Sequence, residues 1–86
     1  MNDLKRLRSK IDEVDGRILN FLKERVRICE TIGNTKKTLQ IPVKDPDREM
    51  RVYAFVRGRA EEIGLDPDKV EAIYRQIVNM CSSVQE

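Results

Sequence analysis

The feature that most constrains the fold is an apolar stripe in a segment that contains no proline before residue 42. Large apolar side chains recur there at steps of three, four or seven residues, which is the spacing of one face of an α-helix. They are Leu4, Leu7, Ile11, Val14, Ile18, Phe21, Ile28, Ile32 and Leu39. The pattern predicts one helix from about Asp3 to Leu39, roughly 55 Å long at about 1.5 Å per residue.

A rod of this length does not fit inside a compact domain of 86 residues, because such a domain has a radius of gyration of about 12 Å. A domain this short buries only about 60% of the surface of its unfolded chain, so self-association would stabilise it. The stripe also continues to both ends of the predicted helix. We therefore expect residues 1–86 to form a single domain whose stripe is covered by a second chain.

Two Asp-Pro pairs mark the starts of further helices. In each pair the aspartate has the features of an N-cap and the proline those of a first helical residue. The sequence predicts one helix from Pro46 to about Ile63, capped by Asp45, and another from Pro67 towards the end, capped by Asp66. The predicted fold class is therefore all-α, with one long helix and two short ones.

The charge balance and the missing residue types exclude several classes of function. Lys and Arg together number 17 and Asp and Glu 15, for a net charge of +2, and the two signs are interleaved. This argues against a nucleic-acid partner and against binding to a membrane surface. There is no histidine, so histidine general-base catalysis and most zinc sites are excluded, and we expect no metal.

The chain has no recognisable membrane or secretion signal. No segment approaches the about 18 consecutive apolar residues of a membrane span, and the start lacks the apolar core of a signal peptide. Cys29 and Cys81 are single and form no CxxC pattern. We therefore expect reduced thiols in a cytoplasmic protein, without a disulfide.

One arginine interrupts the apolar stripe. The seven-residue series through Leu4, Ile11 and Ile18 meets Arg25 before it resumes at Ile32. A charge at such a position is costly to bury without a partner. Either the stem of Arg25 packs while its head reaches solvent, or the arginine lines a pocket for an anionic ligand inside a helical bundle.

The positions of two further cations around the predicted helix can be compared with that of Arg25. Lys36 follows it by eleven residues, about 20° more than three full turns of helix, so the two share a face. Arg8 precedes it by seventeen residues, roughly 100° around the helix, so a partner helix would have to bring Arg8 to the same pocket. Without Arg25, both would be interpreted as ordinary solvated residues.

Two more groups of polar residues have the spacing of a shared helical face. Asp45, Arg48 and Glu49 fit a capped and salt-bridged helix start, or a site that fixes an arginine and a ligand hydroxyl. Cys81 and Gln85 are four residues apart, and Gln85 by default is exposed at a frayed helix end.

The order and spacing of these residues resemble the all-helical class of chorismate mutases over essentially the whole chain. The matching segments are Leu7-Arg8-Ser9-Lys10-Ile11-Asp12, Glu24-Arg25, Lys36, Pro42-Val43-Lys44-Asp45-Pro46-Asp47-Arg48-Glu49 and Gln85. The resemblance implies an intertwined homodimer of three-helix subunits with two equivalent active sites. It also implies chorismate as the substrate and no cofactor.

The resemblance further implies a role for each cation. Arg8 would bind a substrate carboxylate across the interface, and Arg25 would bind the second carboxylate from the same chain as the rest of the site. Lys36 would contact the ether oxygen and a carboxylate, while Gln85 would donate a hydrogen bond to the ether oxygen. Arg48 would support the carboxylate network.

The remaining positions would surround the ring hydroxyl. Asp45 and Glu49 match residues near that group, and Glu49 also lies near the breaking ether bond in the family. Cys81 stands where the family often has serine, and a thiol is the weaker hydrogen-bond donor.

Two other functions remain open at this point. One is an isochorismate-pyruvate lyase on the same scaffold, which the spacing separates poorly from a mutase. The other is a non-catalytic helical dimerisation or regulatory module, although such a module would favour an aliphatic residue in place of Arg25.

Overall fold

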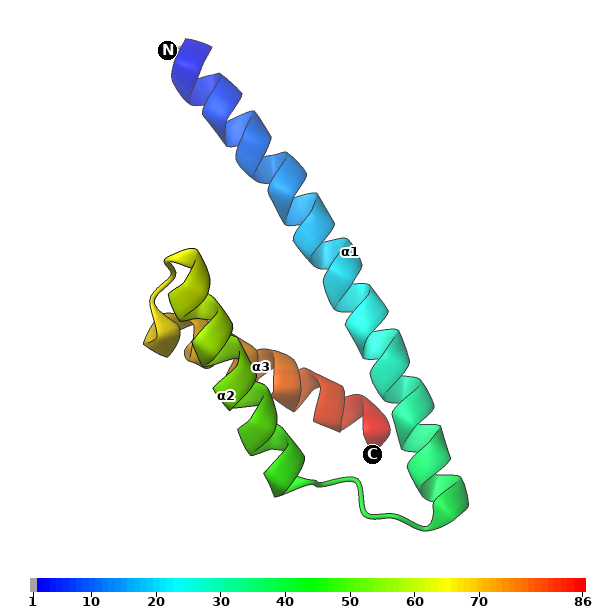
Figure 1. Cartoon of the computed structure of the whole chain (residues 1–86). Coiled ribbons are helices and arrows are strands. Elements are labelled where there is room, and N and C mark those ends of the chain that lie inside the picture. The colour runs from blue at the N-terminus through cyan, green and yellow to red at the C-terminus, as the bar shows by residue number, and fades with distance from the viewer. Residues whose placement is uncertain (1) are drawn as a thin grey trace.

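The computed structural model describes residues 2–86 and contains three α-helices within that range (Figure 1). They are α1 (Asn2–Leu39), α2 (Pro46–Ile63) and α3 (Pro67–Gln85). No strand occurs among the described residues. The all-α prediction of one long and two short helices is therefore confirmed.

Local capping determines where the short helices begin and end. The Asp45 carboxylate accepts the backbone N–H of Arg48 at 3.1 Å, and that of Asp66 accepts the backbone N–H of Asp68 at 2.9 Å. Gly64 follows α2 in the left-handed region at a φ of 81°, which glycine adopts without a steric penalty. These contacts involve neighbours in sequence, so they form without help from the rest of the fold.

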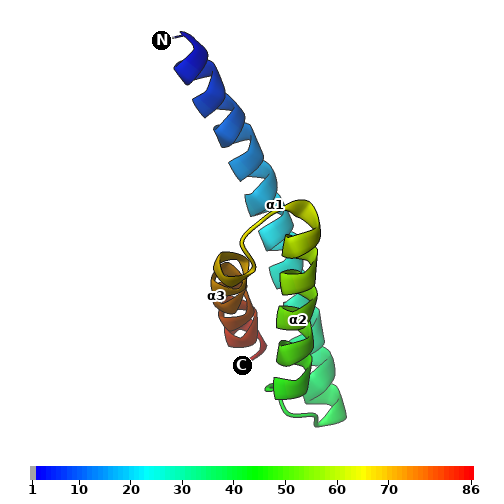
Figure 2. The same ribbon diagram turned by 60° about the vertical axis from the view of Figure 1, so that its left-hand side comes forward.

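α3 is the helix that holds the chain together. It packs against α1 on one side and α2 on the other, whereas the backbones of α1 and α2 do not meet within the described residues. Figures 1 and 2 show α3 against the C-terminal half of α1, while the N-terminal half of α1 extends beyond both short helices. An ion pair of 3.0 Å between Arg57 on α2 and Glu71 on α3 joins the two short helices.

The single chain has too small a core for its length. Its radius of gyration is 16.3 Å, against about 12 Å for a compact domain of this size. The buried apolar side chains are Cys29, Val56, Ala60, Val78 and Cys81. The stripe residues in the first half of α1 are 45–59% exposed, and they are Leu4, Leu7, Ile11, Val14 and Ile18. The chain by itself leaves the stripe uncovered.

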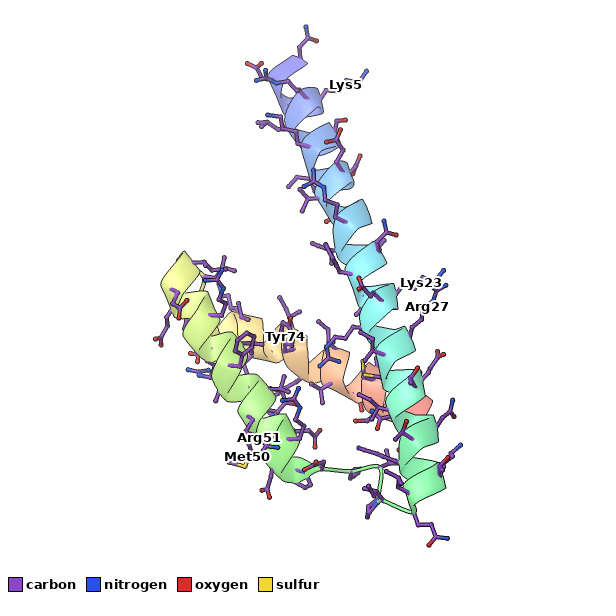
Figure 3. All side chains as sticks on the ribbon, turned by 45° about the vertical axis from the view of Figure 1, so that its right-hand side comes forward. Lys5, Lys23, Arg27, Met50, Arg51 and Tyr74 are labelled. Atoms are coloured by element: carbon purple, nitrogen blue, oxygen red, sulfur yellow. The ribbon has the colours of Figure 1, made fainter. Side chains whose placement is uncertain are left out.

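The opposite side of α1 is polar. Lys23 and Arg27 project away from α2 and α3 (Figure 3). α1 therefore has one apolar face and one charged face, and α2 and α3 leave the N-terminal half of the apolar face uncovered. No helix within residues 2–86 is both long and apolar enough to cross a membrane.

Replacing the α3 cap tests the local origin of the helix boundaries. We expect Asp66→Ala to lower the free energy of unfolding by about 1 kcal/mol, because the N–H of Asp68 loses its acceptor. Asp66→Asn should keep most of the stability, since an amide oxygen also caps. Urea unfolding followed by circular dichroism measures both. An Asp66→Ala protein that unfolds at the wild-type urea concentration would contradict the capping role.

Candidate active site

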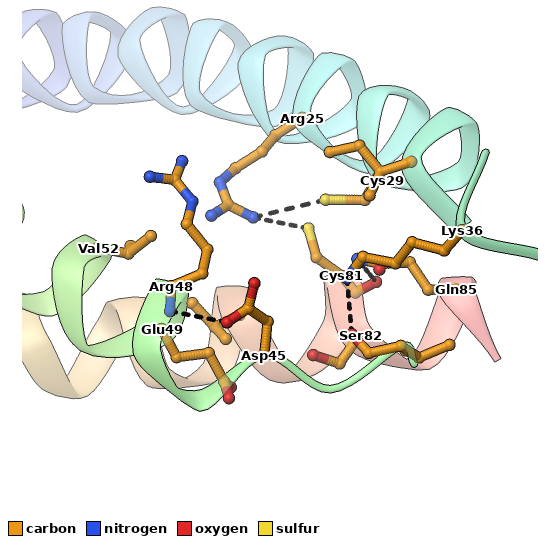
Figure 4. A pocket seen from close by; sticks show the side chains of 13 residues that line it. Arg25, Cys29, Lys36, Asp45, Arg48, Glu49, Val52, Cys81, Ser82 and Gln85 are labelled. Carbon is orange, nitrogen blue, oxygen red and sulfur yellow. Dashed lines mark hydrogen bonds between the residues drawn. The ribbon is translucent and has the colours of Figure 1, made fainter. Parts of the chain in front are cut away.

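All three helices contribute to one pocket, together with the segment that links α1 to α2. The cavity measures about 140 Å³ and lies beside the C-terminal half of α1. It is lined by seven of the eight residues that the sequence singled out, namely Arg25, Lys36, Asp45, Arg48, Glu49, Cys81 and Gln85. Residues up to 60 positions apart in the chain thus line the same pocket (Figure 4).

Arg25 is a half-buried cation without a counter-ion. Its Nη1 donates to the sulfur of Cys81 at 2.8 Å and to that of Cys29 at 3.8 Å. Sulfur is a weak acceptor, and Arg25 forms no ion pair with any residue in the range 2–86. The guanidinium is therefore held in place by the protein and remains free to bind an anion.

Lys36 is the second half-buried cation of the pocket. Its Nζ donates to the carbonyl oxygen of Val43 at 2.7 Å, which ties the linker to α1. The ammonium has two further N–H donors, and no carboxylate of the described chain pairs with it. Arg25 and Lys36 thus place in the pocket two positive charges that have no carboxylate partner among the described residues.

The start of α2 contributes its cap but no salt bridge. The Asp45 carboxylate caps the helix, as expected. Of the capped and salt-bridged helix start that the sequence left open, the cap is present, but neither Asp45 nor Glu49 forms an ion pair with Arg48 among the described residues. Figure 4 shows the guanidinium of Arg48 directed toward the same end of the pocket as that of Arg25. Glu49 and the second carboxylate oxygen of Asp45 are thus available to a ligand.

Gln85 corrects the default expectation of a frayed, exposed end. α3 stays helical through Gln85, and the side chain is half-buried against the pocket. Its Nε2 donates to the carbonyl oxygen of Cys81 at 3.3 Å, a long bond. Its Oε1 is buried and has no hydrogen-bond partner. Such an amide is poorly satisfied and available to a ligand.

Cys29 is a pocket residue that the sequence analysis missed. It lies four residues after Arg25, on the same face of α1, and this spacing was the available signal. Cys29 and Cys81 are distant in sequence but meet in the pocket, and both are free thiols, as expected. Burial, and then the hydrogen bond with Cys81, raise the pKa of the Cys29 thiol from 9.0 to about 11. The other missed residues are mostly apolar wall positions, namely Ile32, Val43, Val52, Val78 and the polar Ser82.

Arg8 does not reach this pocket in the single chain. It lies on the exposed N-terminal half of α1, beside Leu4 and Asp12. This agrees with the angle between Arg8 and Arg25, which places the two on different faces of α1.

Comparison with known proteins identifies similar chains. A family model described as chorismate mutase type II matches residues 7–86. A bifunctional chorismate mutase/prephenate dehydratase of Aquifex aeolicus is 33% identical over 100% of this chain. A chorismate mutase of Methanocaldococcus jannaschii is 30% identical over 96% of the chain.

The similarity extends to the fold. A solved structure of a conserved hypothetical protein from Pyrococcus furiosus superposes with a TM-score of 0.79 at 34% identity, and it covers 100% of this chain and 99% of that one. The chain spans 25% of the length of the Aquifex protein and 84% of that of the Methanocaldococcus protein.

The raised pKa of Cys29 predicts a loss of stability at alkaline pH. The unfolded thiol ionises near pH 9.0 and the folded one near pH 11, so its stabilising effect is complete below pH 9.0 and is lost as the pH rises toward 11. We expect this thiol to account for about 2 kcal/mol of the decline in unfolding free energy. Arg25, Lys36 and Cys81 are the charged or titratable groups that face it.

Comparison with Cys29→Ala removes the Cys29 thiol together with its interaction with Cys81, while the remaining titrating groups are common to the two proteins. Urea unfolding between pH 9 and pH 11 should show a shallower decline for Cys29→Ala than for the wild type. Parallel curves would show that Cys29 does not titrate as described.

Proposed function

The chain belongs to the chorismate mutase type II family, and we propose that it converts chorismate to prephenate, a step toward phenylalanine and tyrosine. The observation that carries this proposal is the pair of unneutralised cations, Arg25 and Lys36, in one pocket with the amide of Gln85. We further propose that residues 1–86 work as one mutase domain in the cytoplasm, whose reducing conditions suit two free thiols.

The residues of the pocket suit the demands of this reaction. It is an intramolecular Claisen rearrangement, which uses no nucleophile, no proton transfer and no cofactor, so a chain without histidine is not at a disadvantage. The substrate carries two carboxylates, and its enolpyruvyl arm must fold over the ring. A guanidinium binds a carboxylate through two parallel hydrogen bonds. Two arginines would hold the folded conformer and lower the entropic part of the barrier.

Charge develops on the ether oxygen as its bond to the ring breaks. Lys36 and Gln85 would stabilise that charge as donors placed before it appears, an effect worth about 3–4 kcal/mol per donor. The ammonium of Lys36 has spare N–H groups, and Nε2 of Gln85 leaves only a long bond to the Cys81 carbonyl when it turns to the substrate.

The acidic residues and Cys81 would orient the ring. Asp45 and Glu49 face the pocket and can accept a hydrogen bond from the ring hydroxyl, while Glu49 would also lie near the breaking bond. Arg48 would support the carboxylate network beside Arg25. Cys81 would act through its contact with Arg25 more than through its weak S–H donor.

The site would be completed by a second chain in an intertwined homodimer. The pocket holds Arg25 for one carboxylate, and the same helix cannot bring Arg8 to it. Arg8 lies on the half of α1 whose apolar side chains are uncovered, so a partner that covers this stripe would carry its own Arg8 toward this pocket. The dimer would thus bury the stripe and supply the second guanidinium together.

Loss of chorismate absorbance with the purified protein tests the function directly. We expect Arg25→Ala and Lys36→Ala each to lower kcat/KM by about 10²–10³, because each removes a group that binds developing or fixed negative charge. Arg27→Ala is the matched control, since Arg27 points away from the pocket. Near-normal turnover by Arg25→Ala or Lys36→Ala would contradict the assignment.

Product analysis separates the mutase from the two other functions. An isochorismate-pyruvate lyase would release pyruvate from isochorismate and leave chorismate unchanged. A regulatory module would turn over neither substrate, and chorismate would not raise its melting temperature.

The neutral amide of Gln85 predicts a flat pH–rate profile around neutrality. A glutamate in its place donates a hydrogen bond only when protonated, and its ordinary pKa is about 4.3. We expect Gln85→Glu to be slow at neutral pH and to recover as the pH falls, while the wild type changes little. A Gln85→Glu profile as flat as that of the wild type would show that this side chain does not act as a donor.

A further inference from the structure

α1 and α3 approach each other closely at a glycine. Gly33 is buried in α1, and a Cβ added to it would lie 2.8 Å from Cα of Gln85 and 3.1 Å from both its Cβ and Cγ. The first distance is shorter than real Cβ contacts, and it involves backbone, which cannot rotate away. Any side chain at Gly33 would therefore displace the last turn of α3.

Other glycines in the helices show that this approach is specific. A Cβ at Gly16 in α1 or at Gly58 in α2 would meet nothing within 4 Å. A glycine inside a helix costs about 1 kcal/mol relative to alanine. At Gly33 the glycine is required because α3 packs too closely for a side chain, and the residue of α3 at this contact is Gln85.

Little else holds the side chain of Gln85. Its Oε1 has no partner, and its Nε2 makes one bond of 3.3 Å to a carbonyl of its own helix. The methylene groups of Gln85 lie against the open surface of Gly33. This contact sets how near to α1 the amide lies, and hence its distance from Lys36.

We propose that Gly33 is a positioning residue, which seats the amide of Gln85 beside Lys36 so that the two donors reach the same ether oxygen. The inference rests on the proposed mutase function. Arg25 and Lys36 are on α1 itself, and Cys81, which holds the guanidinium of Arg25, precedes the last turn of α3. A shift confined to that last turn therefore leaves the carboxylate-binding cations where they are. The role of Gly33 is therefore to set the rate of the reaction and not the affinity for the substrate.

The steady-state kinetics of Gly33→Ala test this role. We expect kcat to fall by about tenfold to a hundredfold, because a displacement of about 1 Å costs that much, while KM stays within about twofold. Gly16→Ala is the matched control and should keep wild-type kcat and KM. A Gly33→Ala enzyme with unchanged kcat, or with a loss that is entirely in KM, would overturn the proposal.

A double-mutant cycle distinguishes positioning from a general structural effect. If Gly33 acts through Gln85, then Gly33→Ala/Gln85→Ala should have the same kcat as Gln85→Ala alone. Losses that multiply in the double variant would overturn the proposal. Alanine is the better helix former, so α1 is not weakened. A Gly33→Ala protein without a helical circular dichroism signal would assign Gly33 to folding and also overturn the proposal.

A measurement on the protein without substrate tests the role of Gly33 separately from the proposed function. The side-chain amide of Gln85 gives a nuclear magnetic resonance signal that should move in Gly33→Ala and stay in place in Gly16→Ala. A signal that stays in place in both variants would overturn the positioning role. Absence of chorismate turnover by the wild type would instead contradict the proposed function, while the shift of the Gln85 signal would still report the contact.

Discussion

The guanidinium of Arg25, half-buried and without a counter-ion, is the feature on which the rest of the structure depends. It interrupts the apolar stripe of α1, and its only hydrogen-bond acceptors within residues 2–86 are two sulfur atoms. A cation partly removed from water is stabilised poorly by such acceptors and strongly by a carboxylate. The pocket therefore contains a positive charge that a bound anion would stabilise. Lys36 adds a second positive charge on the same face of the same helix.

The packing of α3 against α1 and α2 gives the pocket around Arg25 its shape. α3 is the helix that contacts both others, and it brings Cys81 against Arg25 and Gln85 against Gly33. In the proposed mechanism the first contact would hold a binding group and the second would seat a donor for the reaction. The N-terminal half of α1 remains outside this arrangement, with its apolar face uncovered. The same exposed surface therefore explains the low compactness of the chain, and it is the surface on which the proposed partner would bring its Arg8 to the site.

The parts of the fold that depend on local chemistry were predictable from sequence. The capping aspartates, the prolines that follow them and the period of the stripe act within a few residues, so the helices begin and end where the pattern indicated. The shared face of Arg25 and Lys36 follows from helical geometry alone. The burial of the Gln85 side chain could not be predicted from the sequence, because it depends on a contact with Gly33, which is 52 residues away in sequence. The spacing of Cys29 from Arg25 indicated its face of α1, but its burial arises only when α3 packs against α1.

The central claim is that two chains share one cationic site, and mixing two inactive variants tests it most directly. Arg8→Ala chains and Arg25→Ala chains should each be inactive as homodimers. After unfolding and refolding as an equal mixture, half of the dimers should be mixed, each with one intact site, so that about a quarter of wild-type chorismate turnover returns. A mixture of Arg25→Ala with Lys36→Ala chains should recover nothing, because both groups come from the same chain. No recovery in the first mixture, or equal recovery in both, would contradict the account.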